Sequence, residues 1–192
     1  MRKAVLERKT KETAVKIVVD LDSAGGSAVT SGIDFFDHML GQFAFYAGIS
    51  LNVECRGDLN VDGHHTVEDV GITLGQAVLK ALGDKKGINR YGAATVPMDE
   101  SQASVALDIS GRPYLVFNAK FPAANVGGLD TELCEEFFRA VASNCGMTLH
   151  VNLAYGKNTH HMIEAVFKAF GCAFGQAVRI TGAGVRSTKG SL

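Results

Sequence analysis

An internal repeat constrains the fold of this chain more than any other feature. The pentad HHTVE at residues 64–68 recurs as HHMIE at residues 160–164. The tetrad GQAV follows each copy, at residues 75–78 and 175–178. Two copies of an uncommon pattern in matching context indicate a duplication rather than coincidence. We therefore expect two similar halves, residues 1–87 and 88–192, within one compact domain.

Hydrophobic patterning predicts the same order of elements in both halves. Apolar residues alternate with polar ones over 13–21 and 51–55, which predicts strands. Helices are expected from Asp34, a candidate N-cap, to Gly48 and over 64–82. The second half predicts strands over 91–96, 105–109, 114–119 and 149–153, with helices capped by Asp130 and Asn158. The predicted class is α+β: a tandem duplication of a strand-strand-strand-helix-strand-helix unit, with sheets packed on helices.

Composition excludes several classes of protein. Hydrophobic residues make up 46% of the 192 residues, which argues against disorder. A net charge of −1 provides no field that would recruit nucleic acid or an acidic membrane, and no apolar run is long enough to span a bilayer. The four cysteines form no CxxC pair, which favours reduced thiols. We expect a cytoplasmic protein, or an organellar one if a transit segment was removed.

The spacing within the pentad determines which side chains can share one metal ion. Successive helical residues lie ~100° apart, so His64 and His65 diverge. Glu68 shares a helix face with either histidine. Each helix therefore offers a His–Glu pair to one ion and a lone histidine to another. Ligation by nitrogen and oxygen favours Mn, Fe, Co or Zn, although surface or capping histidines are the simpler alternative.

Several other segments complete a recognisable set. They are FFDHML (35–40), DGHHTVED (62–69), NRYG (89–92), PMDES (97–101), DISGRPYLVFNA (108–119), NTHH (158–161), FKAF (167–170) and STKG (187–190). In this order, and over nearly the whole chain, they resemble the imidazoleglycerol-phosphate dehydratase family. The resemblance implies a fold like ribosomal protein S5 domain 2, duplicated within the chain.

The resemblance also implies a set of metal ligands. In that family two Mn²⁺ ions per active site lie between neighbouring subunits. The matching positions here are His38, His64, His65, Glu68, Glu136, His160, His161 and Glu164. Glu136 is a departure, because some relatives carry EHFF where this chain has EEFF at residues 135–138. A carboxylate is an acceptable Mn²⁺ ligand, so Glu136 remains a candidate.

Substrate-binding residues follow from the same resemblance. The implied phosphate pocket comprises Gln42, Arg90, Arg112, Lys168, Ser187, Thr188 and Lys189. By themselves, the two arginines beside turns, the helical lysine and the C-terminal tail would more simply be solvated residues. Glu12 matches a substrate-site glutamate, and His38, His64 and His160 are expected to contact substrate as well. Glu12, Glu68 and Glu164 are the candidate catalytic acids.

The implied reaction converts imidazole glycerol phosphate to imidazole acetol phosphate and water, in histidine biosynthesis. A dinuclear metallohydrolase acting on a phosphate ester is the alternative enzyme, because metal sites beside a phosphate pocket also serve hydrolysis. A metal-storing shell is the non-enzymatic alternative, but it leaves the basic residues without a role. The resemblance further implies a homo-oligomer of about 24 subunits built from trimers, with metal sites at subunit interfaces.

Overall fold

The computed structural model describes residues 1–190 and 192. The elements of the first half are β1 (Lys3–Lys9), β2 (Thr13–Asp20), β3 (Ala28–Thr30), α1 (Asp34–Ala47), β4 (Ser50–Gly57) and α2 (His64–Leu82). Those of the second half are β5 (Tyr91–Met98), β6 (Ser101–Asp108), β7 (Tyr114–Asn118), β8 (Asn125–Val126), β9 (Leu129–Asp130), α3 (Leu133–Cys145), β10 (Thr148–Tyr155) and α4 (Thr159–Val178). Apart from the β8–β9 hairpin, both halves have the predicted element order.

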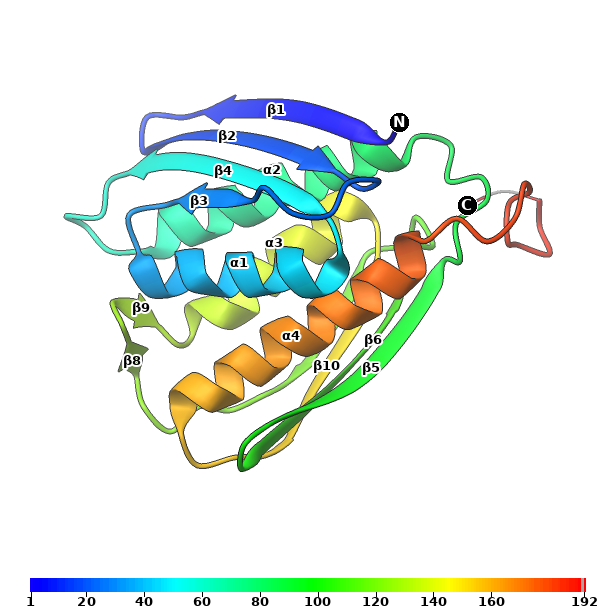
Figure 1. The fold of residues 1–192 in the computed structure, drawn as a ribbon. Helices are drawn as coiled ribbons and strands as arrows, with labels where there is room; N and C mark the ends of the chain where they lie inside the picture. The colour runs from blue at the N-terminus through cyan, green and yellow to red at the C-terminus, as the bar shows by residue number, and fades with distance from the viewer. Residues whose placement is uncertain (191) are drawn as a thin grey trace.

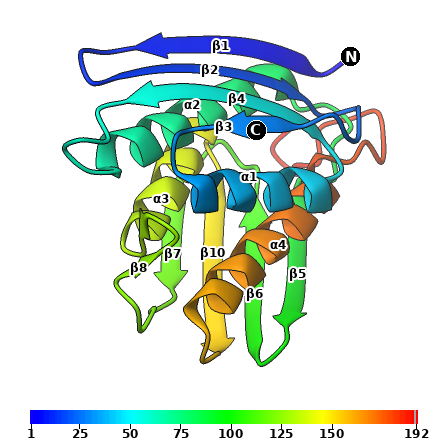
Figure 2. The same ribbon diagram turned by 60° about the vertical axis from the view of Figure 1, so that its left-hand side comes forward.

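The two halves also share one sheet topology. The first sheet has the order β1-β2-β4-β3 and the second β5-β6-β10-β7. In each sheet three strands are antiparallel and the last is parallel to its neighbour. The helices lie between the two sheets (Figures 1 and 2), with α2 against β1 and β2 and α4 against β5 and β6. The predicted α+β duplication is confirmed.

The core lies where the helices meet each other and the sheets. Alternate residues of β2, such as Val15, Ile17 and Val19, point inward and are buried. Between the helices, the ring of Phe43 on α1 stacks on that of Phe170 on α4, with centroids 4.8 Å apart. Large aromatic side chains thus fill the space between the two halves, and burial of this area is a major stabilising contribution.

Two of the predicted helix caps are wrong, and one is confirmed. Asp34 is the first helical residue, and Ile33 occupies the cap position without a side-chain hydrogen bond. Asp130 belongs to β9 and accepts a hydrogen bond from the Asn125 side chain at 2.8 Å, so α3 begins only at Leu133. Asn158 does cap α4, accepting from the backbone N–H groups of the next two helical histidines. An Asp can satisfy several local geometries, and Asp130 pairs across its own β8–β9 hairpin instead of capping a helix.

The GQAV tetrads are not structurally equivalent, which corrects the alignment of the repeat. Gly75 and Gly171 each lie at the same distance after their histidine pair. A Cβ on Gly75 would meet the Val141 carbonyl oxygen at 2.8 Å, and one on Gly171 would meet that of Phe43 at 2.7 Å. These two glycines are the matched close-approach points, where α2 crosses α3 and α4 crosses α1. The second tetrad therefore lies one helical turn further along its helix.

Two smaller predictions concern thiols and membranes. All four cysteines are free, and Cys55, Cys134 and Cys145 are buried. Burial raises the pKa of Cys134 and Cys145 to about 12, so these thiols stay protonated. Among the described residues, no helix is long and apolar enough to cross a membrane.

Candidate active site

All four helices begin at the same end of the molecule, on the left in Figure 1, and this end holds the histidine pentads. Here His38 of α1 meets His160 and Glu164 of α4. The Glu164 Oε2 atom lies 3.1 Å from His160 Nε2 and 3.8 Å from His38 Nε2. One ligand atom from each of the three lies within 4.8 Å of the others, and these are nitrogen and oxygen donors suited to a divalent cation.

Glu164 is held in its ionised form. The residue is 5% exposed, and the Lys168 ammonium lies 2.7 Å from its Oε1 atom. Burial acts to raise the pKa of Glu164, but Lys168 and the histidines outweigh it and lower that pKa. This end of the molecule thus presents a buried carboxylate anion beside two imidazoles, as metal binding requires.

The lone histidine of the second pentad is fixed by a carboxylate. His161 Nδ1 lies 2.9 Å from an oxygen of Glu100, in the turn between β5 and β6. Glu100 also accepts the backbone N–H groups of Asn158 and Lys157, and these bonds together with His161 hold its pKa far below the usual range. The same contact raises the pKa of His161. The ring is therefore held through Nδ1, which leaves Nε2 as its outward ligand atom.

The first pentad repeats this arrangement with different acids. His65 Nδ1 lies 3.0 Å from Asp58, which follows β4, and Nε2 lies 3.7 Å from Glu12. The Asp58 contact, followed by the charge of Glu12, raises the pKa of His65. Glu12 and Glu100 occupy matching places, each directly before the second strand of its sheet. The sequence analysis assigned no role to Asp58 or Glu100. The duplication could have identified Glu100, because it occupies the place in the second half that Glu12 occupies in the first.

The remaining predicted ligands stay apart within one chain. His64 is exposed at the start of α2, and no ion pair of 4 Å or less joins it to Glu68 among the described side chains. Glu136 instead lies 3.5 Å from Arg139 on its own helix. In the part of the chain that the structure describes, only the trio of His38, His160 and Glu164 converges. One chain thus brings together three of the eight predicted ligands.

A basic cluster forms at the opposite end of the molecule. Arg90 is buried, and its guanidinium pairs with both oxygens of Asp108, at 2.6 and 3.0 Å. Arg112 lies 3.7 Å from the same carboxylate and is exposed. Arg90 also donates to the Arg186 carbonyl oxygen at 2.8 Å, which places the segment carrying Ser187, Thr188 and Lys189 beside it. The interpretation of Arg90 as a solvated loop residue is thereby wrong.

The predicted phosphate residues do not all gather there. Lys168 pairs with Glu164, and Gln42 lies one turn after His38 on α1, so both belong to the histidine end. Arg90 contacts the other end of α4 through the Ala177 carbonyl oxygen. From His160 to Ala177 the helix runs roughly 25 Å, at a rise of ~1.5 Å per residue. The two ends are therefore too far apart for one small molecule to contact both in a single chain.

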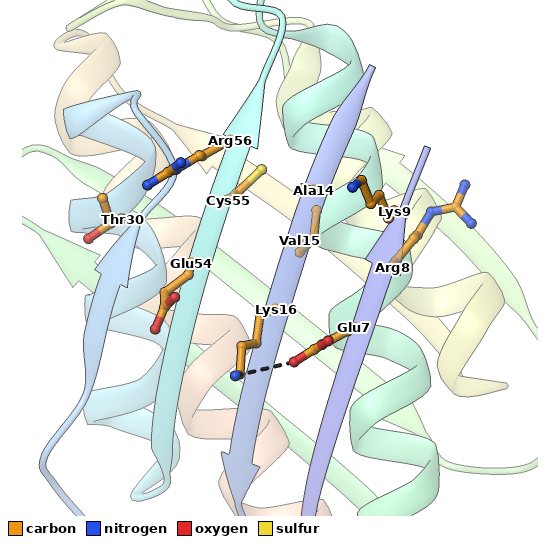
Figure 3. A pocket seen from close by; sticks show the side chains of 10 residues that line it. All are labelled: Glu7, Arg8, Lys9, Ala14, Val15, Lys16, Thr30, Glu54, Cys55 and Arg56. Carbon is orange, nitrogen blue, oxygen red and sulfur yellow. Dashed lines mark ion pairs between the residues drawn. The ribbon is translucent and has the colours of Figure 1, made fainter. Parts of the chain in front are cut away.

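A cavity of about 560 Å³ lies on the outer face of the first sheet. Figure 3 shows its lining side chains standing on β1, β2, β3 and β4, with Lys16 paired to Glu7 at 3.2 Å. None of the predicted site residues lines it. Its mixed charges give no reason to assign it to the chemistry.

Comparison with known proteins identifies the relatives of this chain. The family model described as imidazoleglycerol-phosphate dehydratase matches residues 31–174. Proteins of that name from Geobacter metallireducens and Desulforamulus reducens are 54% and 57% identical, over 100% of this chain and 99% and 98% of theirs. The crystal structure of the Staphylococcus aureus protein is 46% identical, with a TM-score of 0.85 over 93% of this chain and 99% of that one. The Pyrococcus furiosus structure is 34% identical, also with a TM-score of 0.85, over 97% of this chain and 100% of that one.

Proposed function

Because the chain belongs to the imidazoleglycerol-phosphate dehydratase family, hydro-lyases of histidine biosynthesis, we propose that it works with two Mn²⁺ ions at a site shared between subunits. The substrate is imidazole glycerol phosphate, and the products are imidazole acetol phosphate and water. The main support for a site shared between subunits is the separation of the histidine end from the basic end, roughly 25 Å along α4.

The side chains at the histidine end suit the proposed metal. His38, His160 and Glu164 provide two imidazoles and one carboxylate. His161 and His65 are each held through Nδ1 at the same end of the molecule. Mn²⁺ accepts both kinds of ligand. Within one chain the remaining ligands do not converge. A second chain would complete the ligand set, which includes His64, Glu68 and Glu136. Bound metal would supply positive charge that favours loss of the proton from the substrate's imidazole.

The chain's own residues then position groups and carry protons. Lys168 keeps Glu164 ionised, so Glu164 serves as a ligand rather than as an acid. Glu12 is exposed at its turn and faces His65, a position from which it can exchange a proton with a substrate beside that ring. Glu68 is half-buried on α2 and remains the second candidate for proton transfer.

At the other end, a cluster of cations receives the phosphate. Arg112 is exposed, and a guanidinium suits bidentate contact with phosphate oxygens. The tail adds the Ser187 hydroxyl and the Lys189 ammonium. Because a phosphate held here lies far from the histidines of the same chain, the imidazole must reach those of a neighbouring subunit. Closed symmetry satisfies every such contact at once, which agrees with a homo-oligomer of about 24 subunits built from trimers.

Turnover of the substrate tests the proposal. Purified protein is incubated with imidazole glycerol phosphate and Mn²⁺, and both the ketone product and free phosphate are measured. We expect the ketone to form with phosphate retained, and chelation by EDTA to stop the reaction. Release of inorganic phosphate would instead support a metallohydrolase, and turnover unaffected by complete metal removal would overturn the role of Mn²⁺.

A further inference from the structure

Asp108, at the end of β6, carries a carboxylate that pairs with two arginines of the basic end. Its side chain is only 16% exposed. Both oxygens accept from one guanidinium, that of Arg90, and Oδ2 also lies 3.7 Å from Arg112. A planar guanidinium that meets a carboxylate through two parallel hydrogen bonds is fixed in direction as well as in distance.

Arg90 is constrained on its backbone as well. Its φ angle is 72°, a left-handed backbone conformation that residues other than glycine rarely adopt. The backbone N–H donates to Ala177 at 2.9 Å, and the carbonyl oxygen accepts from Ile109 at 3.0 Å. These bonds tie Arg90 to the end of α4 and to the residue that follows Asp108. The strained conformation aims the guanidinium at Asp108 and at the C-terminal tail.

The tail is held by the same residue. Arg90 Nη1 donates to the Arg186 carbonyl oxygen at 2.8 Å, and Arg186 donates in turn to the carbonyl of Asn89 at 3.2 Å. Ser187 follows immediately, and its hydroxyl accepts from the Lys189 backbone N–H at 3.2 Å. A continuous series of contacts therefore runs from Asp108 through Arg90 to the segment with the phosphate-binding hydroxyl and ammonium.

We propose that Asp108 is a positioning residue that, through Arg90, fixes residues 186–189 where Ser187 and Lys189 contact the substrate's phosphate. Without its carboxylate, the Arg90 guanidinium would be a buried and unpaired cation, beside two other positively charged side chains. It would then turn away and release the Arg186 carbonyl. This inference rests on the proposed function, because it assumes that the basic end receives phosphate.

Substitution Asp108→Asn tests the inference, with Asp84→Asn as a matched control. Asp84 is an exposed aspartate that pairs with its neighbour Lys86, at 2.8 Å. For each Mn²⁺-loaded protein, KM and kcat are measured with imidazole glycerol phosphate. Inhibition is measured with inorganic phosphate, which probes the basic end, and with imidazole, which probes the metal end. Amide exchange in the peptide covering residues 183–190 reports on the tail.

We expect Asp108→Asn to raise KM and the inhibition constant of phosphate at least about tenfold, with kcat and imidazole inhibition little changed. Amide exchange in the tail should accelerate, while Asp84→Asn behaves like the wild type. The proposal would be overturned if inhibition by phosphate and inhibition by imidazole weakened equally, or if inhibition by phosphate were unchanged.

Asp108→Glu keeps the charge and provides a second route if Asp108→Asn does not fold. It should show a smaller rise in KM in the same phosphate-specific pattern, and unchanged phosphate inhibition would again contradict the role. A wild-type protein that does not turn over the substrate would instead refute the proposed function. The two failures are therefore distinguishable.

Discussion

At the scale of single residues, neighbouring carboxylates determine how the histidine rings are oriented. His65 and His161 are each held at Nδ1 by an acid from another element, Asp58 and Glu100. His160 instead faces Glu164 through Nε2. Adjacent histidines on one helix thus receive different orientations, as the divergence of neighbouring helical positions requires. The two rings of the second pentad therefore face different partners.

The Glu100 contact predicts a measurable proton affinity. In metal-free protein, Glu100→Gln should lower the pKa of His161 toward its ordinary value, because the main cause that raises it is lost. A raised pKa means that this contact stabilises the fold at pH below the ordinary value and that the stabilisation fades as pH rises through the raised pKa. NMR titration of the ring protons measures this directly. The exposed Glu7→Gln variant is the control, and an unchanged His161 pKa in Glu100→Gln would contradict the assigned contact.

The phosphate end makes a separate prediction about binding. Arg112→Ala or Lys189→Ala should raise KM roughly tenfold to a hundredfold, because each removes a charged hydrogen bond to phosphate. The turnover number should change much less, since neither side chain reaches the reacting carbons. Steady-state kinetics with imidazole glycerol phosphate provides the measurement. The same KM in both variants as in the wild type would show that the phosphate binds elsewhere.

At the scale of elements, two glycines set how closely the helices approach. Gly171→Ala should destabilise the protein by about 1–3 kcal/mol, because its Cβ would lie 2.7 Å from the Phe43 carbonyl oxygen. Gly41→Ala is the matched control, since a Cβ there meets nothing within 4 Å. That control should gain roughly 0.5–1 kcal/mol from helix propensity. Chemical denaturation compares the two, and similar effects of both substitutions would rule out the close crossing.

The elements also show how far the sequence determines the structure. The pentads and the Asn158 cap were predictable because helix spacing and capping are local properties. The caps at Asp34 and Asp130 were wrong: Ile33 takes the cap position of α1, and Asp130 pairs with Asn125 in the β8–β9 hairpin. An aspartate suits several local geometries, and the residue type alone does not determine which one forms. Strand β1 was not located, because Ala4 is its one buried residue and alternation there is weak. The links from Glu100 to His161 and from Arg90 to the Arg186 carbonyl oxygen join residues 61 and 96 positions apart, which only the folded chain brings together.

At the scale of the whole molecule, the proposed site is divided between the two ends of α4. We expect a large oligomer in the presence of Mn²⁺ that falls to smaller units when EDTA removes the ions, because ions at a subunit boundary act as crosslinks. Light scattering before and after chelation gives the masses. Restoring Mn²⁺ should rebuild the oligomer, and a mass that EDTA leaves unchanged would argue against metal at the interface.

Mixing two defective variants tests the shared site most directly. His160→Ala disables the histidine end, and the double variant Arg112→Ala/Lys189→Ala disables the basic end. Each variant is first assayed alone, at substrate concentrations well below KM. The two are then dissociated with EDTA, combined in equal amounts and reassembled with Mn²⁺, and the mixture is assayed under the same conditions. If each site takes its two ends from different chains, about a quarter of the sites are intact, and the mixture should recover about a quarter of wild-type activity. Activity no higher than the average of the separate variants would contradict the account.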